Sequence, residues 1–327
     1  MLVDDAYALG FLGANMLFSE LCKLYLADKR DGRKAVRANT LEGYESAIRT
    51  HLLPQWGEAE AETIAYSDVQ TWVDSFPKGR GAEKAYKTLR QIVRWAIGKR
   101  LVVMADPTVG VEVPRPQRRE SRTLTDSQLN HMLYKCKGEP WEAVVWCQAT
   151  LGLRRCEAVA LTWGDIDLRS GEVRITKGRH VVGGKVYTWG TKTPKSTRTV
   201  VLPRFAVERL REIRRERRAL PGELLCDLRP DAISRRFRSW CRRNGFRGVT
   251  MMQLRHSFAT ISVRAGVPIE VVAMMLGHSD LTMCYQRYVA RSLDVFKAAQ
   301  RKFADTVLRA VRPDAVLDRW QSPVLVA

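Results

Sequence analysis

MMQLRHSFATISVRAGVPIEVVAMMLGHSDLTMCYQRYVA, residues 251–290, is the most informative segment of this 327-residue chain. Leu254-Arg255-His256 opens a pattern of apolar residues at helical spacing. A Leu276-Gly277-His278 turn follows, and Tyr288 comes ten residues after the histidine. We therefore expect a helix, a glycine turn and a tyrosine-bearing segment, in a part of the chain where helices dominate from residue 204 to about residue 312.

Two earlier segments carry charged residues that admit two interpretations each. In GLRRCEAVALTWGDIDL, residues 152–168, Gly152 precedes a helical pattern that places Arg154 and Glu157 on one face. Near a helix start, Arg154 adds its donors to the positive end of the helix dipole, which suits a phosphate. The alternative is a surface ion pair with Glu157. In TKTPKSTRTVVLP, residues 191–203, Lys192 lies on a turn between two strands, where it either protonates a leaving oxygen or is only solvated.

Together the three segments resemble the signature of the tyrosine recombinase, or phage integrase, family. The resemblance covers roughly residues 16–312, because the N-terminal helical half is also similar to the family's core-binding domain. The matching residues occur in the family's order, with Arg154 and Arg255 as the two catalytic arginines, Glu157 as the acidic companion of the first, Lys192 as the hairpin lysine, His278 as the later histidine and Tyr288 as the nucleophile.

The resemblance implies a site-specific DNA recombinase that cuts and rejoins the DNA of a mobile element through a 3′-phosphotyrosine intermediate at Tyr288. Arg154 and Arg255 would stabilise the charge that develops on the phosphate oxygens. His278 would add a hydrogen bond to the same group.

The remaining roles also come from the resemblance. Glu157 would hold the basic cluster in place, and Lys192 would protonate the departing 5′ oxygen. The phosphotyrosine keeps the energy of the broken bond, so the 5′ hydroxyl of a second strand can reverse the step. The resemblance therefore implies neither a metal nor a nucleotide cofactor.

Two positions depart from the pattern that is usual in the family. Met252 stands three residues before Arg255, where the family usually has a histidine, and a thioether neither accepts a proton nor donates a useful hydrogen bond. We expect reduced activity. The alternatives are that water or a neighbouring group replaces the histidine, or that the chain is an inactivated copy. Tyr288 lies ten residues after His278, as in a subset of the family, whereas a spacing of nine gives Arg287.

Two neighbouring side chains are assigned supporting roles. Tyr285, seven residues after His278, is interpreted as a packing aromatic. His256, beside Arg255, is expected to support the site through hydrogen bonding.

The composition favours a nucleic-acid partner. Lysine and arginine number 55 against 35 aspartate and glutamate, and the formal excess of 20 positive charges is spread along the whole length. Such a surface favours a polyanion, and a soluble basic protein is the alternative.

Seven cysteines without a CxxC pair or a zinc-like cluster are interpreted as reduced thiols, and no metal site is predicted. We find no signal peptide and no apolar run of about 20 residues, so we expect a soluble cytoplasmic protein, associated with the nucleoid and not with a membrane.

The length favours about two domains. Apolar residues recur at helical spacing in the first, and Pro54 with Gly57 and Pro77 with Gly79 and Gly81 divide it into about four helices. VEVPRPQRRESRT, residues 111–123, has two prolines, four arginines and little to bury, as is typical of an extended linker. We assign an N-terminal tail to residues 1–15, a helical core-binding DNA domain to 16–110, the linker to 111–122, a catalytic domain to 123–312 and a C-terminal tail to 313–327.

The second domain is expected to be α+β. Thr125-Asp126-Ser127-Gln128 predicts a helix start with a capping box. Strand-like runs at 172–176, 185–189 and 197–202, separated by glycine and proline turns, predict a small antiparallel sheet. The whole chain is thus expected to be mainly α, with an all-helical, SAM-like N-terminal domain and an α+β catalytic domain that close around duplex DNA.

Double-stranded DNA at recombination sites is the expected partner. The resemblance implies a homotetramer on two synapsed sites, with residues 293–311 packing on a neighbour, and it allows accessory DNA-bending or directionality factors. Five arginines on one predicted helix are candidate phosphate contacts, namely Arg235, Arg236, Arg238, Arg242 and Arg243.

Two other classes of function stay open. The first is a catalytically weakened, integrase-derived DNA-binding protein, which Met252 favours and which would form no covalent adduct. The second is a type IB topoisomerase-like enzyme, which shares the phosphotyrosine chemistry but relaxes supercoils at a single site without a tetramer.

Overall fold

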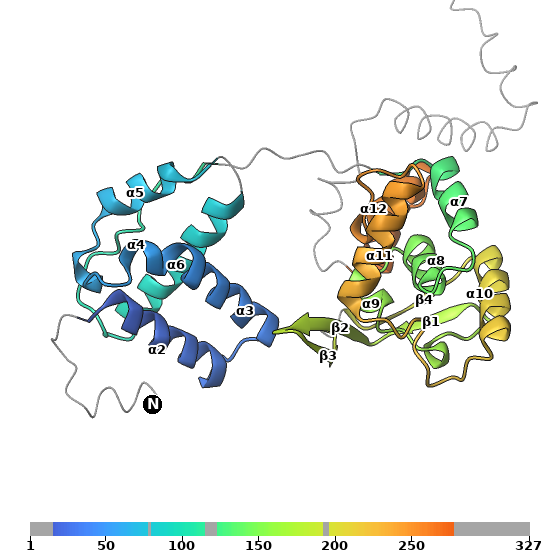
Figure 1. Ribbon diagram of the computed structural model, residues 1–327, viewed down its shortest axis with the longest axis horizontal. Helices are drawn as coiled ribbons and strands as arrows, with labels where there is room; N and C mark the ends of the chain where they lie inside the picture. The colour runs from blue at the N-terminus through green and yellow to red at the C-terminus, as the bar shows by residue number, and fades with distance from the viewer. Residues whose placement is uncertain (1–15, 78–79, 115–122, 192–195, 278–327) are drawn as a thin grey trace, which may run out of the picture. The chain divides into compact units, whose positions relative to one another are not determined.

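The computed structural model describes residues 16–77, 80–114, 123–191 and 196–277 (Figure 1). Within these ranges the chain is mainly helical and divides near residue 120 into two compact units, each with its own apolar core. Residues 181–185, at the tip of a hairpin, group with the first unit. The predicted fold class is confirmed. No helix in the described ranges is long and apolar enough to cross a membrane.

The first unit is a helical bundle. α3 (Ala38–Ala47), a π-helical turn (Ile48–Leu52) and α4 (Leu53–Trp56) form one continuous rod. The other elements are α2 (Phe18–Asp31), a 3₁₀ turn (Ala61–Thr63), α5 (Tyr66–Ser75) and α6 (Arg80–Gly98). With the continuous segment from α3 to α4 counted as one helix, the described residues of this unit contain four helices, in agreement with the predicted number of about four.

Pro54 does not interrupt the second of these helices, contrary to the prediction. A proline lacks the N–H group that would bond to the carbonyl four residues earlier. The preceding turn is wider than an α-turn, since the N–H of Leu53 donates to the carbonyl of Ile48, five residues back. A π-turn accommodates such a local gap in the hydrogen-bond ladder. The helix consequently continues past Pro54 and ends at Gly57.

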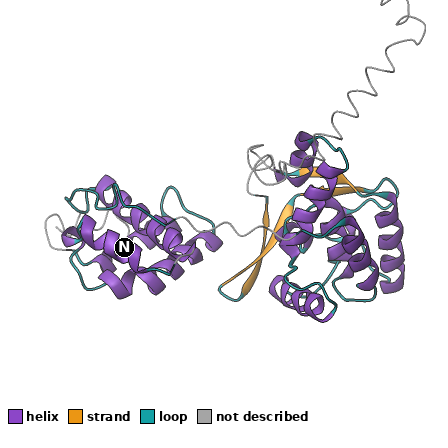
Figure 2. Ribbon diagram, turned by 90° about the horizontal axis from the view of Figure 1, so that it is seen from above, coloured by secondary structure: helices purple, strands orange, loops and turns teal. Residues whose placement is uncertain are grey.

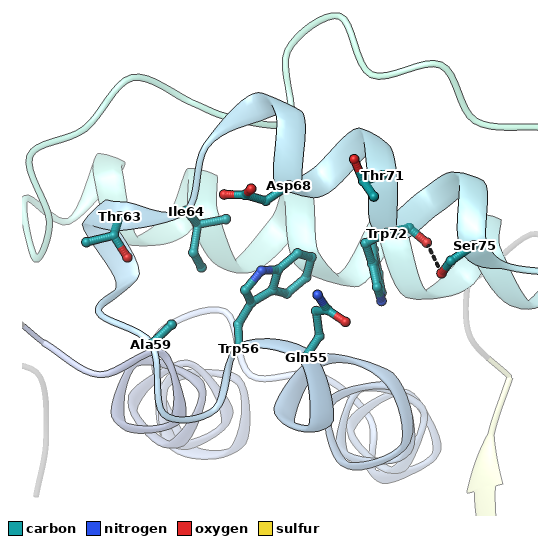
Figure 3. A pocket seen from close by; sticks show the side chains of 9 residues that line it. All are labelled: Gln55, Trp56, Ala59, Thr63, Ile64, Asp68, Thr71, Trp72 and Ser75. Atoms are coloured by element: carbon teal, nitrogen blue, oxygen red, sulfur yellow. Dashed lines mark hydrogen bonds between the residues drawn. The ribbon is translucent and has the colours of Figure 1, made fainter.

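A hollow of about 400 Å³ lies between α4 and α5, beside the 3₁₀ turn (Figure 3). Trp56 and Trp72 form part of its wall, and their ring centroids are 4.8 Å apart. None of the predicted catalytic residues and none of the five predicted arginine contacts lines it. The hollow is therefore separate from the candidate site described below.

The second unit is built around a buried helix, α8 (Glu142–Leu151). Nine of its ten residues are buried, as is typical of a helix enclosed by others. The other described helices of the unit are α7 (Asp126–Lys135), α9 (Arg155–Ala158), α10 (Arg204–Arg217), α11 (Pro230–Arg243), α12 (Met251–Arg264) and α13 (Ile269–Leu276), with a 3₁₀ turn at Trp163–Asp165. Of these, α7, α10 and α12 pack against α8.

The described strands form two antiparallel pairs (Figure 2). β1 (Glu172–Ile175) pairs with β4 (Arg198–Val201). β2 (Lys177–Val182) and β3 (Lys185–Gly190) form a hairpin about the predicted Gly183-Gly184 turn, whose φ angles are 53° and 75°. β1, β3 and β4 were predicted, but β2 was missed, because its sequence KGRHVV shows no alternation of apolar and polar residues.

Thr125 caps α7 as predicted. Its Oγ1 accepts a hydrogen bond from the N–H of Gln128 at 3.2 Å, and Gln128 Oε1 accepts one from the N–H of Thr125 at 3.1 Å. The N–H of Leu124 donates to Ser257 Oγ at 2.8 Å. The beginning of the second unit is thereby fastened to α12, the helix that carries Arg255.

Candidate active site

Four segments that are distant in the sequence meet at the carboxyl end of α13. The turn after α8 contributes Arg154, α9 contributes Glu157, β4 contributes Arg198 and α12 contributes Arg255. The three arginines donate to the backbone carbonyls of residues 275–277, which immediately precede His278 in the chain, and Glu157 joins the cluster through its bonds to Arg154 and Arg198.

Arg154 and Glu157 form an ion pair in which the glutamate side chain is buried. Arg154 Nη1 lies 2.8 Å from Glu157 Oε1, and the backbone N–H of Arg154 donates to Oε2 at 2.9 Å. The side chain of Glu157 is 6% exposed and that of Arg154 is 36% exposed. Arg154 Nη2 donates to the carbonyl of Gly277 at 2.7 Å. The ion pair therefore orients a guanidinium group that still reaches solvent.

Arg255 is buried, with 4% of its surface exposed. Its Nη1 donates to the carbonyl of Gly152 at 2.9 Å, and its Nη2 donates to the carbonyl of Leu276 at 3.0 Å. Gly152 ends α8 with a φ of 66°, and a Cβ at this position would lie 2.4 Å from the ring of Phe258. Glycine is thus required for both the turn and the close approach of α12.

Arg198 is a member of the cluster that the sequence interpretation missed. Its Nη2 lies 2.9 Å from Glu157 Oε2, and its Nε donates to the carbonyl of Met275 at 2.8 Å. A signal for it was present in the strand pattern. Because strand residues alternate between faces, Arg198 shares a face with Val200 and Leu202, both of which are buried. A charged residue on a buried face requires a partner.

The electrostatics of the cluster suit an anion. Carbonyl groups at the end of α13 carry the negative end of the helix dipole, which attracts guanidinium groups. The cluster nevertheless contains three arginines and one carboxylate, and only Arg154 and Arg198 bond to that carboxylate, so the cluster has an excess of positive charge. Burial opposes ionisation of Glu157, but the hydrogen bonds and charges of Arg198 and Arg154 outweigh it and hold the pKa of this carboxyl below its usual value. Glu157 is therefore charged at neutral pH.

Several predicted site residues remain untested by this geometry. Lys192, His278 and Tyr288 lie outside the described residues. The hydroxyl groups of Thr191, the residue before Lys192, and Thr197, the residue before β4, lie 2.8 Å apart.

The two remaining predicted residues of this region lie on α12. Met252 is 49% exposed in the first turn of the helix, whereas His256 is 6% exposed. In the described part of the chain, no group of three or more histidine, cysteine, aspartate or glutamate residues is arranged to hold a metal.

The arginines of α11 lie on the exposed face of that helix. Its other face, which includes Phe237 and Trp240, is buried in the core. A hollow of about 570 Å³ beside α11 is lined by three of the five predicted arginines and by a fourth that was missed, and its charged lining consists of Arg235, Arg238, Arg242 and Arg247. Arg236 and Arg243 are exposed on the same helix but do not line it.

Known proteins resemble the chain in both units. Residues 122–293 match the Phage integrase family, and residues 17–76 match the Phage integrase, N-terminal SAM-like domain. Tyrosine recombinase XerA of Saccharolobus solfataricus is 24% identical over 263 residues, which are 78% of this chain and 84% of the relative.

Two solved structures have a similar fold. The Tn1549 transposon integrase in complex with transposon right end DNA has a TM-score of 0.73 at 18% identity and covers 88% of this chain and 100% of its own. A lambda integrase tetramer bound to a Holliday junction has a TM-score of 0.65 at 18% identity, with 86% and 79% covered. The match to the Phage integrase family spans more than half of the sequence and includes every member of the arginine and glutamate cluster, so the chain belongs to the phage integrase family.

Proposed function

We propose that the chain is a site-specific DNA recombinase in which Tyr288 attacks a DNA phosphate held by Arg154 and Arg255. One observation carries the proposal. Both arginines donate to the carboxyl end of α13, which leads directly into His278. Membership of the phage integrase family and the likeness to a tyrosine recombinase support the same function.

The proposed reaction is a transesterification. The phenolic oxygen of Tyr288 attacks phosphorus, the bond from phosphorus to the 5′ oxygen breaks, and the 3′ phosphate becomes joined to tyrosine. Lys192 gives a proton to the departing 5′ oxygen, and the phenolic proton passes to water or a neighbouring group, because Met252 cannot accept it. A 5′ hydroxyl of a second strand then attacks the phosphotyrosine and releases Tyr288. One ester replaces another, so no nucleotide is consumed.

The two arginines would stabilise the transition state through their fixed orientation. Negative charge grows on the nonbridging oxygens of the phosphate, and donors that are already in place need no reorganisation to meet it. Arg255 is held by the carbonyls of Gly152 and Leu276, and Arg154 is held by Glu157 and Gly277. Proposed further contributors are His278, through a hydrogen bond to the phosphate, and His256, through support of Arg255.

We further propose that the enzyme acts on double-stranded DNA in the nucleoid as a homotetramer on two recombination sites. The likeness to a lambda integrase tetramer bound to a Holliday junction supports this assembly. Residues 16–110 would bind core DNA, 111–122 would link the domains, 123–312 would form the catalytic domain, and 293–311 would pack on a neighbouring subunit. Accessory DNA-bending or directionality factors would act on the same assembly.

The test is to trap the covalent intermediate. The substrate is a DNA duplex taken from the junctions that flank the chain's own gene, with a nick close to the cleavage point. After cleavage, the short fragment that carries the freed 5′ hydroxyl diffuses away, so the strand cannot be rejoined and the covalent adduct accumulates. We expect a protein-DNA band that resists denaturant and disappears after protease treatment. If the chain binds this duplex specifically but no such band forms, it is a DNA-binding protein and not a recombinase. Relaxation of supercoils by a monomeric preparation would instead indicate a topoisomerase.

Met252→His is expected to raise the rate of covalent complex formation by about 100-fold, because a positioned proton acceptor contributes on the order of 10²–10⁴ to such steps. Met252 is half-exposed, so the imidazole has room. The measurement is the first-order rate of band formation with saturating protein. Met274→His, at an exposed methionine of α13, is the matched control and should leave the rate unchanged. Equal rates for the parent and Met252→His would mean that another group already accepts the proton.

Arg238→Ala and Arg242→Ala are each expected to reduce the slope of log affinity against log salt by about one unit, as expected for the loss of one phosphate contact. Both residues line the arginine-rich hollow of α11. Arg215→Ala, at an exposed arginine of α10, is the control. Affinity is measured by fluorescence anisotropy over a range of potassium chloride concentrations. Slopes equal to that of the parent would exclude this face of α11 from the DNA interface.

A further inference from the structure

Arg198 is almost enclosed, although it is the first residue of a strand. Its side chain is 9% exposed, and Val200, on the same face of β4, is buried. Burying a guanidinium group carries a large desolvation cost unless all of its donors find acceptors. The contacts of Arg198 therefore have to explain its position.

Those contacts connect the two halves of the candidate site. Arg198 reaches both oxygens of Glu157, with Nη2 at 2.9 Å from Oε2 and Nη1 at 3.3 Å from Oε1. Its Nε donates to the carbonyl of Met275 at 2.8 Å, and its Nη1 donates to that of Ser196 at 3.1 Å. One planar group thus holds α9, the end of α13 and the segment before β4.

The carboxylate of Glu157 is shared evenly between Arg198 and Arg154. Oε1 accepts from Nη1 of both arginines, and Oε2 accepts from Arg198 Nη2 and from the backbone N–H of Arg154. A carboxylate offers about four acceptor positions, so these four bonds fill it. The orientation of Glu157 toward Arg154 consequently depends on Arg198.

Gly277 lies close to the same two arginines. A Cβ at Gly277 would lie 2.9 Å from Nη1 and 3.1 Å from Cζ of Arg198, so the backbone of this residue lies directly against the guanidinium plane. The carbonyl of Gly277 accepts from Arg154 Nη2. His278 is the next residue in the chain.

We propose that Arg198 is a positioning residue for strand cleavage. It fixes the position of Glu157, and through Glu157 that of Arg154, relative to residues 275–277, which precede His278 in the chain. This inference rests on the proposed recombinase function and adds a residue to it. Arg198 does not touch the phosphate. It acts by setting where Arg154 and the backbone of residues 275–277 lie with respect to one another.

The test compares Arg198→Gln with Arg209→Gln. Arg209 is an equally buried arginine, paired with Glu142 between α10 and α8, and it makes no contact with the cluster. We expect Arg198→Gln to lower the first-order rate of covalent complex formation about 100-fold at saturating DNA, the scale of a small misplacement of catalytic groups. DNA affinity should not change. Arg209→Gln should lower the melting temperature but keep the parent's rate per folded molecule.

Three further results separate positioning from general destabilisation. Arg198→Lys should recover part of the rate, because it restores the charge next to Glu157 but not the bond to Met275. The effects of Arg198→Gln and Glu157→Gln on the rate should be much less than additive, because both act on Arg154. Should Arg198→Gln be unfolded at the assay temperature, Arg198→Lys is compared with Arg209→Lys, with the first expected to be slower.

The inference is overturned if the parent chain forms a Tyr288-dependent adduct and the Arg198 variants form it as fast as the matched Arg209 variants do. Additive effects with Glu157→Gln would overturn it as well. A parent chain that forms no adduct at all would instead contradict the proposed function.

Discussion

Tyr288→Phe is expected to form no covalent complex with DNA, whereas Tyr285→Phe is expected to form it at the parent's rate. The change removes one oxygen atom, which in the proposed mechanism is the nucleophile itself. Loss of the nucleophile in covalent catalysis lowers the rate by roughly 10⁴-fold or more. DNA affinity should stay the same, because a phenylalanine keeps the aromatic ring and removes no charge.

The measurement uses the nicked duplex with saturating protein and follows the denaturant-resistant band over time. Peptide mapping of the parent's adduct should find the nucleotide on the peptide that contains Tyr288. The neighbouring Tyr285 is a matched control, because it lies three residues away in the same segment. An adduct that persists in Tyr288→Phe and disappears in Tyr285→Phe would move the nucleophile to seven residues after His278.

The local features that the sequence predicted correctly are those set by local geometry. Arg154 is the N-cap residue of α9 and Glu157 lies three residues later in its first turn, so the geometry of a helix start brings the two together. The Thr125 capping box likewise depends on a hydrogen bond between residues three positions apart. The glycine turn at Gly277 follows from the need for a left-handed residue at a helix end, and its φ is 66°.

The features that were missed depend on distant partners or on backbone geometry that residue propensities do not reveal. Arg198 bonds to Glu157, 41 residues away, and to Met275, 77 residues away, so no local pattern identifies its partners. Pro54 lies inside a helix because a π-turn before it tolerates the missing hydrogen bond, a choice that residue propensities do not predict. The roles of Lys192, His278 and Tyr288 stay predictions from the family resemblance.

Arg154→Gln is expected to lower the first-order rate of covalent complex formation by about 1000-fold, because removal of an oriented donor to a developing oxyanion costs on the order of 10²–10³ and removal of an arginine from a transferring phosphate costs at least as much. The protein should stay folded. Arg198 continues to pair with Glu157 after the change, so no unpaired carboxylate is left buried.

Arg155→Gln is the matched control for this prediction. Arg155 is the next residue in the chain and carries the same charge, but it is exposed and its Nη1 contacts Ser234 Oγ at 3.2 Å. Arg154→Lys adds a second comparison, because it keeps the charge and loses the planar fork that can hold Glu157, Gly277 and a phosphate oxygen together. If the site works by oriented donors, Arg154→Lys should be nearly as slow as Arg154→Gln, and Arg155→Gln should match the parent. If Arg154→Lys and Arg155→Gln both keep the parent's rate, the contribution of Arg154 is its charge alone, and the geometry that Glu157 and Gly277 impose on it has no part in the cleavage step.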